Sequence, residues 1–72
     1  MKAKDYKLSR TAWELLINEW IISPRDKSIV QDRIFEDLTY SEIADKHHLS
    51  EESVRKILTR CKITLEDAMR LP

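Results

Sequence analysis

Residues 38–58 read LTYSEIADKHHLSEESVRKIL, and this stretch contains two helical patterns with very few residues between them. The first pattern opens at residues 39–42 (TYSE) with the S/T-x-x-E spacing of a capping box, whose two ends each satisfy the other's free backbone N–H. The second opens at Ser50, a residue type that caps helix N-termini. Only residues 47–49 (HHL) join the two patterns, and so short a connection makes helices cross steeply. The stretch predicts a helix-turn-helix over about 39–62.

The second helix of this motif, expected over residues 50–62, has one apolar face and one polar face. At 100° per residue, the side expected to face the core collects Val54, Ile57, Leu58 and Cys61. The opposite side collects Glu52, Arg55, Lys56, Thr59 and Arg60. A helix held by its apolar face projects the other face as a convex rod that fits the major groove of duplex DNA. We therefore predict that this helix is the recognition helix.

Helical spacing recurs on both sides of the motif, whereas the sustained apolar and polar alternation of strands occurs nowhere. A first helix is predicted over about 9–22 and a second over about 24–37, with a serine and a proline at the boundary between them. Thr64 and Asp67 suggest a last short helix over about 65–71. The expected fold class is all-α, a compact bundle of four to five short helices.

The predicted first helix is apolar on two sides. One stripe, expected to belong to the core, consists of Trp13, Leu16, Ile17, Trp20 and Ile21. Leu15 and Ile22 lie nearly opposite that stripe. We expect the other helices to wrap around and cover these two residues. The alternative is that they meet another molecule, which makes them the candidate dimer surface.

Length and composition limit the organisation of the chain. At 72 residues it can form one domain, which we assign to residues 9–72, preceded by a basic, flexible tail over residues 1–8. With 42% hydrophobic and 36% charged residues it is typical of a globular protein, and no apolar run approaches the roughly 20 residues of a membrane span. No secretory signal is found, and the single Cys61 fits a reducing compartment, so a cytoplasmic location is expected.

Charge is unevenly distributed although the formal net charge is zero. Residues 11–45 carry three positive and eight negative side chains, whereas residues 46–62 carry five positive and two negative ones. The positive charge therefore gathers in the second half of the predicted motif, where a polyanionic partner would bind.

The quoted stretch resembles the helix-turn-helix of region four of bacterial sigma factors, the part that reads the upstream promoter element. The resemblance extends back through SPRDKSIVQDRIFEDLTY, covers roughly residues 23–62, and is shared with the related LuxR-type output domain. It implies a bacterial or phage transcriptional regulator that binds double-stranded DNA and has RNA polymerase as a further candidate partner. Matched by position, the family's DNA contacts fall on Glu51, Glu52, Arg55 and Lys56, with Thr39 and Tyr40 near the DNA backbone.

The chemistry of the residues suits these roles. Arg55 and Lys56 can donate to guanine O6 and N7, and a glutamate at 51 or 52 can accept from cytosine N4. Other basic residues of the motif are suited to phosphate contacts, which set register and salt dependence. The complete candidate DNA-binding set is Thr39, Tyr40, Lys46, Glu51, Glu52, Arg55, Lys56, Thr59, Arg60 and Lys62.

The two histidines depart from the family pattern. His48 stands where the family usually has glycine with positive φ, and His47 stands where it usually has a core-facing leucine. Neither histidine belongs to a metal-binding spacing, so no metal site is expected. There is also no glycine-rich phosphate loop and no nucleophile with an evident base, so neither enzymatic activity nor a cofactor is expected.

Two functions remain open. The first is a sequence-specific DNA-binding regulator, whose single recognition helix and zero net charge favour a dimer or attachment to RNA polymerase. The second is a protein-interaction module that imitates a sigma DNA-reading domain and docks on polymerase or on another regulator. The acidic residues that favour this second function are Glu36, Asp37, Glu42 and Asp45.

Overall fold

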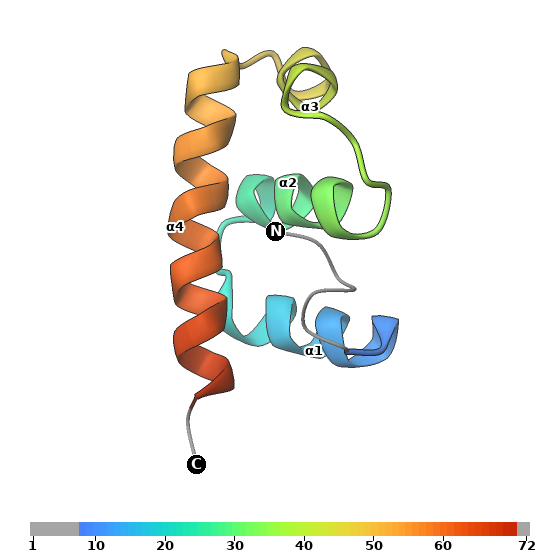
Figure 1. Ribbon diagram of the computed structural model, residues 1–72, viewed down its shortest axis with the longest axis vertical. Coiled ribbons are helices and arrows are strands. Elements are labelled where there is room, and N and C mark those ends of the chain that lie inside the picture. The colour runs from blue at the N-terminus through green and yellow to red at the C-terminus, as the bar shows by residue number, and fades with distance from the viewer. Residues whose placement is uncertain (1–7, 71–72) are drawn as a thin grey trace.

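The computed structural model describes residues 8–70, and Figure 1 shows how their helices are arranged. The elements are α1 (Arg10–Trp20), α2 (Pro24–Ile34), α3 (Tyr40–His47) and α4 (Glu51–Met69). Helix α4 runs the length of the molecule, and α3, α2 and α1 pack one after another along it, from its N-terminal to its C-terminal end. The predicted all-α class is confirmed, and residues 8–70 contain no strand.

Each of these helices begins at a serine or threonine cap, because the first N–H groups of a helix have no partner within it. The hydroxyls of Ser9, Ser23 and Ser50 each accept from the backbone N–H three residues on, at 3.1, 3.4 and 3.1 Å. Thr39 and Glu42 form the predicted capping box, with bonds of 3.1 and 2.9 Å. Hydrogen bonds from the Thr39 backbone and side chain hold the pKa of Glu42 below its usual value.

The hydrophobic core lies between α4 and the three shorter helices. The core-facing side predicted for the recognition helix is confirmed, since its four apolar residues are all buried. The largest fully buried side chains are Trp13, Ile17, Ile29, Ile43, Leu65, Val30 and Val54. All four helices therefore contribute apolar side chains to a single cluster, and this cluster holds α3 and α4 in place.

Helix α1 ends at Trp20, two residues before the predicted end, and Ile21 continues in an extended conformation. The chain leaves the helix here because Ser23 must be extended, both as the cap of α2 and as the residue before Pro24. Of the predicted core stripe, three members are buried: Trp13, Ile17 and Ile21. Leu16 is partly buried, whereas Trp20 is 39% exposed, so its assignment to the core was wrong.

The prediction that other helices cover Leu15 and Ile22 is also wrong. These side chains are 66% and 90% exposed. Helix α1 stands at the end of the row and packs chiefly against α4 and α2, so the outer side that carries Leu15 faces solvent. Ile22 lies in the segment between α1 and α2.

Helix α2 ends at Ile34, three residues before the predicted end. The chain then turns through Asp37, whose φ of 52° lies in the left-handed region and is incompatible with a continuing helix. Within this turn the guanidinium of Arg33 donates to the carbonyl of Leu38 at 2.8 Å. Leu38 packs partly buried against the core.

The separate last helix predicted over residues 65–71 is wrong, because α4 continues without a break from Glu51 to Met69. The Thr64 hydroxyl donates to the carbonyl of Arg60 at 3.1 Å, one turn back, so it does not act as a cap. No proline or glycine interrupts this segment, and nothing therefore ends the helix near residue 62. The described residues form four helices, one of which is long.

The tail predicted over residues 1–8 falls almost entirely on residues 1–7, which lie outside the described residues. Leu8 is described, and it packs partly buried against the core. No helix between residues 8 and 70 has the length and apolar character needed to cross a membrane.

Candidate nucleic-acid interface

The turn between α3 and α4 is as short as the sequence predicted, but it covers residues 48–50 and not 47–49, because His47 is the last residue of α3. His48 caps α3 in the left-handed conformation, with φ 57° and ψ 44°. The backbone N–H of Leu49 donates to the carbonyl of Ala44 at 2.9 Å, which closes the end of α3. Ser50 then caps α4. The two helices are thus joined by three non-helical residues, and the helix-turn-helix is present.

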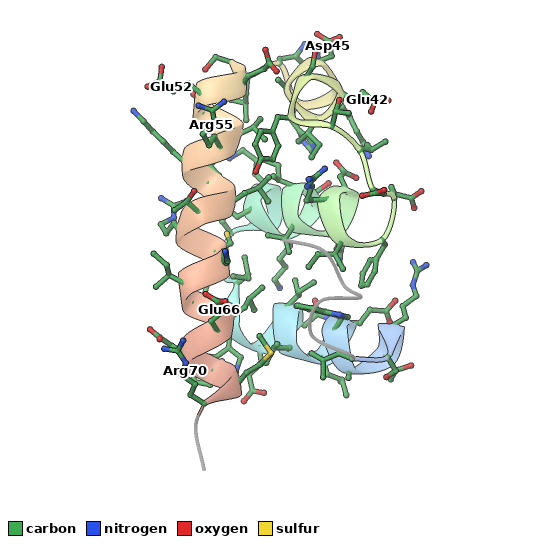
Figure 2. All side chains as sticks on the ribbon, in the orientation of Figure 1. Glu42, Asp45, Glu52, Arg55, Glu66 and Arg70 are labelled. Carbon is green, nitrogen blue, oxygen red and sulfur yellow. The ribbon has the colours of Figure 1, made fainter. Side chains whose placement is uncertain are left out.

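The predicted outward face of α4 is exposed along its N-terminal half, as Figure 2 shows for Glu52 and Arg55. Its exposed members are Glu52, Arg55, Lys56, Thr59 and Arg60. Four of them, together with Ile63 and Thr64, line a shallow hollow of about 450 Å³. Lys56 Nζ lies 3.5 Å from Glu52 Oε1, but both side chains are about three-quarters exposed. An ion pair this exposed is weak, so both groups can exchange it for a ligand.

The start of α3 lies beside the start of α4. The ring of Tyr40 is flanked by the guanidinium groups of Arg33 and Arg55, with centroid distances of 5.2 and 6.0 Å. Thr39 and Tyr40, which were predicted to lie near the DNA backbone, share a hollow of about 320 Å³ with Glu51 and Arg33. The structure therefore brings these predicted residues together at the N-terminal end of α4.

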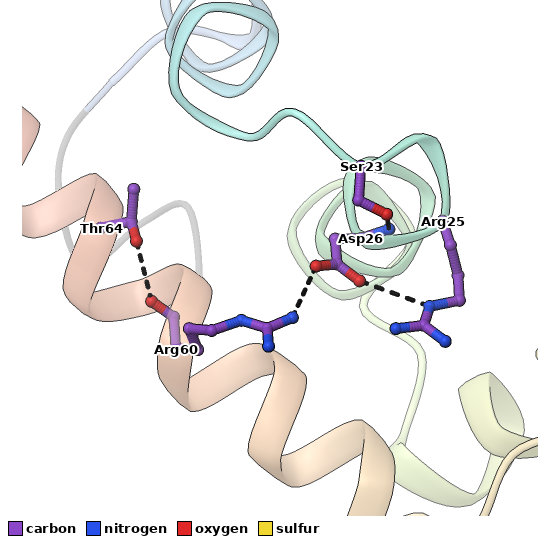
Figure 3. A network of polar contacts seen from close by, with 5 residues as sticks. All are labelled: Ser23, Arg25, Asp26, Arg60 and Thr64. Atoms are coloured by element: carbon purple, nitrogen blue, oxygen red, sulfur yellow. Dashed lines mark hydrogen bonds and ion pairs between the residues drawn. The ribbon is translucent and has the colours of Figure 1, made fainter.

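Arg60 has a partner that the sequence did not predict. Its Nη2 lies 2.7 Å from Oδ2 of Asp26, in the first turn of α2, as Figure 3 shows. Arg25 approaches the other oxygen of the same carboxylate, with Nε 3.4 Å from Oδ1. The Asp26 side chain is only 9% exposed, so it requires such partners.

A second buried aspartate of α2 holds α3 in a similar way. Asp32 accepts from Lys46 Nζ at 2.8 Å, and Nε2 of His47 lies 2.8 Å from its other carboxylate oxygen. Lys46 borders a hollow that also contains Arg10 and Phe35, between α1, α2 and α3. The Lys46 side chain is 53% exposed, and its ammonium pairs with Asp32.

Sequence reasoning missed both aspartates, although one signal was present. Asp32 follows Ile29 by three residues and therefore falls on the buried stripe of α2, where an unpaired carboxylate would be costly. A carboxylate at such a position implies basic partners from a neighbouring helix. Which partners those are depends on packing between helices and cannot be read from spacing.

The two histidines and the cysteine lie in different surroundings. His47 is partly buried beside Asp32, and His48 occupies the exposed turn. Burial raises the pKa of the Cys61 thiol, and the negative charge of nearby Asp26 raises it further. Across residues 8–70, no three histidine, cysteine or acidic side chains are grouped so as to hold a metal ion.

The four acidic residues named for the interaction alternative are exposed, and Figure 2 shows Glu42 and Asp45 on α3, beside the N-terminal half of α4. Two signs of charge therefore lie near each other at this end of the molecule. The basic groups belong to α4, and the acidic ones belong to α3 and to the turn before it.

Comparison with known proteins supports the resemblance seen in the sequence. Residues 21–62 match the family model described as Sigma-70, region 4. The match spans the end of α1, all of α2 and α3, and α4 as far as Lys62. No curated protein and no solved structure matches the chain.

Proposed function

This chain belongs to the Sigma-70 region 4 family of DNA-binding helix-turn-helix domains, and we propose from that membership that it is a sequence-specific transcriptional regulator. The observation that carries the proposal is the two-sided character of α4. Its inner face is buried in the core, whereas its outer face presents Arg55, Lys56 and Thr59 to solvent. A helix supported in this way can enter the major groove without any change in the fold.

We assign base contacts to the N-terminal half of α4. Arg55 and Lys56 are the donors to guanine, and Glu51 or Glu52 is the acceptor from cytosine. Thr59 lies one turn further along the same face and can contact either a base or a phosphate.

The phosphate contacts in the proposal surround this base-reading segment. Thr39 and Tyr40, at the start of α3, contact the phosphates of one DNA strand. The basic side chains of α4 contact the DNA backbone further along. The proposed DNA-binding domain comprises residues 9–72, with the helix-turn-helix over about 39–62. In this proposal the protein binds DNA and catalyses no reaction. Its proposed location is the cytoplasm, a reducing compartment in which the Cys61 thiol would persist.

An alternative function is favoured by the exposed acidic residues beside α4. Glu36, Asp37, Glu42 and Asp45 repel phosphate and suit a basic protein surface. In this alternative the chain imitates a sigma DNA-reading domain and docks on RNA polymerase or on another regulator.

Salt dependence of binding to duplex DNA distinguishes the two functions. If about four basic groups contact phosphates, affinity for duplex should fall roughly 100-fold between about 50 and 200 mM salt. Fluorescence anisotropy of a labelled fragment from upstream of the protein's own gene measures this. An adaptor would show no duplex binding even at the lower salt concentration, and that result would exclude the DNA-binding proposal.

We also propose that the exposed Leu15 and Ile22 form a self-association surface, since a second recognition helix would supply further base contacts. Ile22→Glu should then convert a concentration-dependent dimer into a monomer with unchanged helical content, because Ile22 contributes almost nothing to the core. Sedimentation equilibrium measures the oligomeric state. A wild-type protein that stays monomeric at all concentrations, with and without DNA, would refute this surface.

A further inference from the structure

Arg60 lies between two hollows on the surface of α4. On one side it lines the recognition-face hollow together with Lys56 and Thr59. On the other side it lines a hollow of about 210 Å³ that includes Asp26 and Ser23. Although its guanidinium bonds to the buried Asp26, the Arg60 side chain as a whole is 64% exposed. The charged end is therefore held at the edge of the recognition face and not in the core.

Asp26 does not depend on Arg60 alone. Arg25 lies 3.4 Å from the other carboxylate oxygen. Asp26 is also the third residue of α2, where the partial positive charge of the helix N-terminus favours a carboxylate. Neither of these interactions involves Arg60. The ion pair between Arg60 and Asp26 can therefore break without leaving the carboxylate isolated.

A DNA phosphate offers Arg60 the same chemistry as the Asp26 carboxylate. Both are anionic, and both present oxygen pairs that match the donor fork of a guanidinium. When α4 occupies the major groove, the phosphates that border the groove pass along the edges of the recognition face. Arg60 stands at one such edge, and rotation about its side-chain bonds would carry the guanidinium from Asp26 toward the DNA.

We propose that Arg60 exchanges partners, from Asp26 in the free protein to a DNA phosphate in the complex. Asp26 is then a positioning residue that keeps the guanidinium beside the recognition face and competes with DNA for it. This inference rests on the proposed function, and in it the Asp26 carboxylate of the protein itself competes with DNA for Arg60. Arg60 must give up its ion pair with Asp26 to contact a phosphate, and breaking that pair costs free energy. Asp26 therefore lowers affinity for DNA of any sequence.

The slope of affinity against salt tests this exchange with a short mixed-sequence duplex as the probe, because phosphate contacts do not depend on sequence. Arg60→Ala should reduce the slope of log affinity against log salt by about 0.9, the value of one phosphate contact. Arg60→Lys retains the charge and should restore the slope. Circular dichroism checks that each variant keeps the helical content of the wild type.

Asp26→Asn supplies the second arm of the experiment. It should raise duplex affinity by about fivefold relative to Asp45→Asn, while the salt slope stays at the wild-type value. Asp45 is an exposed acid of α3, so its substitution removes the same formal charge without releasing Arg60. If Asp26→Asn does not fold, Arg60→Ala still tests the phosphate contact, without which the exchange cannot occur.

Two results would overturn the exchange. A wild-type slope in Arg60→Ala would show that Arg60 makes no phosphate contact. A steeper slope in Asp26→Asn would show that Arg60 reaches DNA only when its partner is removed. Wild-type protein that binds no duplex at low salt would instead refute the proposed function, and the exchange with it.

Discussion

Replacing Arg55 and Lys56 together with alanine should lower affinity for a promoter fragment at least about 30-fold. Each good base contact discriminates by about 1 to 3 kcal/mol, and about 1.4 kcal/mol corresponds to a factor of ten. Both side chains point away from the core, so the helical circular dichroism signal should persist. Fluorescence anisotropy with the fragment upstream of the protein's own gene measures the change.

A matched control separates base reading from a general loss of positive charge. Arg10→Ala with Arg70→Ala removes the same formal charge from exposed positions at the first residue of α1 and just after the last residue of α4. This control should change affinity only slightly, through the long-range field. Undiminished binding by the Arg55 and Lys56 double variant would contradict the proposed recognition helix.

Ile17→Ala should destabilise the fold by about 2 to 5 kcal/mol, because it removes a fully buried side chain of α1 from the core cluster and leaves a cavity. A domain of this length has a total stability of roughly 4 to 11 kcal/mol, so the substitution removes a large fraction of it. Urea unfolding followed by circular dichroism gives the free energy of unfolding and its change.

Ile63→Ala is the control for the core substitution. Ile63 is also a helical isoleucine, but it is 56% exposed on the outer side of α4. Its replacement should change the free energy of unfolding by no more than about 0.5 kcal/mol. Equal unfolding midpoints for the two variants would mean that α1 does not pack into the core as described.

Much of the fold was predictable because its signals are local. The capping box links Thr39 to Glu42, three positions on, and the sharp turn before Ser50 follows from the short connection between the two helices. The left-handed conformation of His48 was implied by the family resemblance. The inner face of α4 followed from the periodicity of a helix, since Val54, Leu58 and Cys61 recur along one side. These features need no knowledge of the rest of the chain.

The errors arose where a local signal competed with packing. Thr64 looked like a cap, but its hydroxyl bonds within α4, because packing of α1 against the C-terminal half of this helix favours continuing it. Trp20 fits a helical stripe, but α1 ends there, and the indole is left partly exposed. Periodicity places a residue on a face and does not show how far a neighbouring helix extends over that face.

The candidate site divides in the same way. The exposed face of α4 around Arg55 and Lys56 was predicted from the sequence, since it is the complement of the buried stripe. The partners of Arg60 and Lys46 were not found, because Asp26 and Asp32 lie 34 and 14 positions away in the chain. Without these partners, both basic residues looked free for phosphate.

The sequence by itself determined that the chain forms capped helices, turns sharply at His48 and carries basic residues on one side of the last helix. Hydrogen bonds across three residues and the 3.6-residue period specify these features within short segments. Only the tertiary structure decided which apolar side chains stay exposed and which aspartates hold the basic residues. Those outcomes depend on distances between helices, and the packing of the whole core sets these distances.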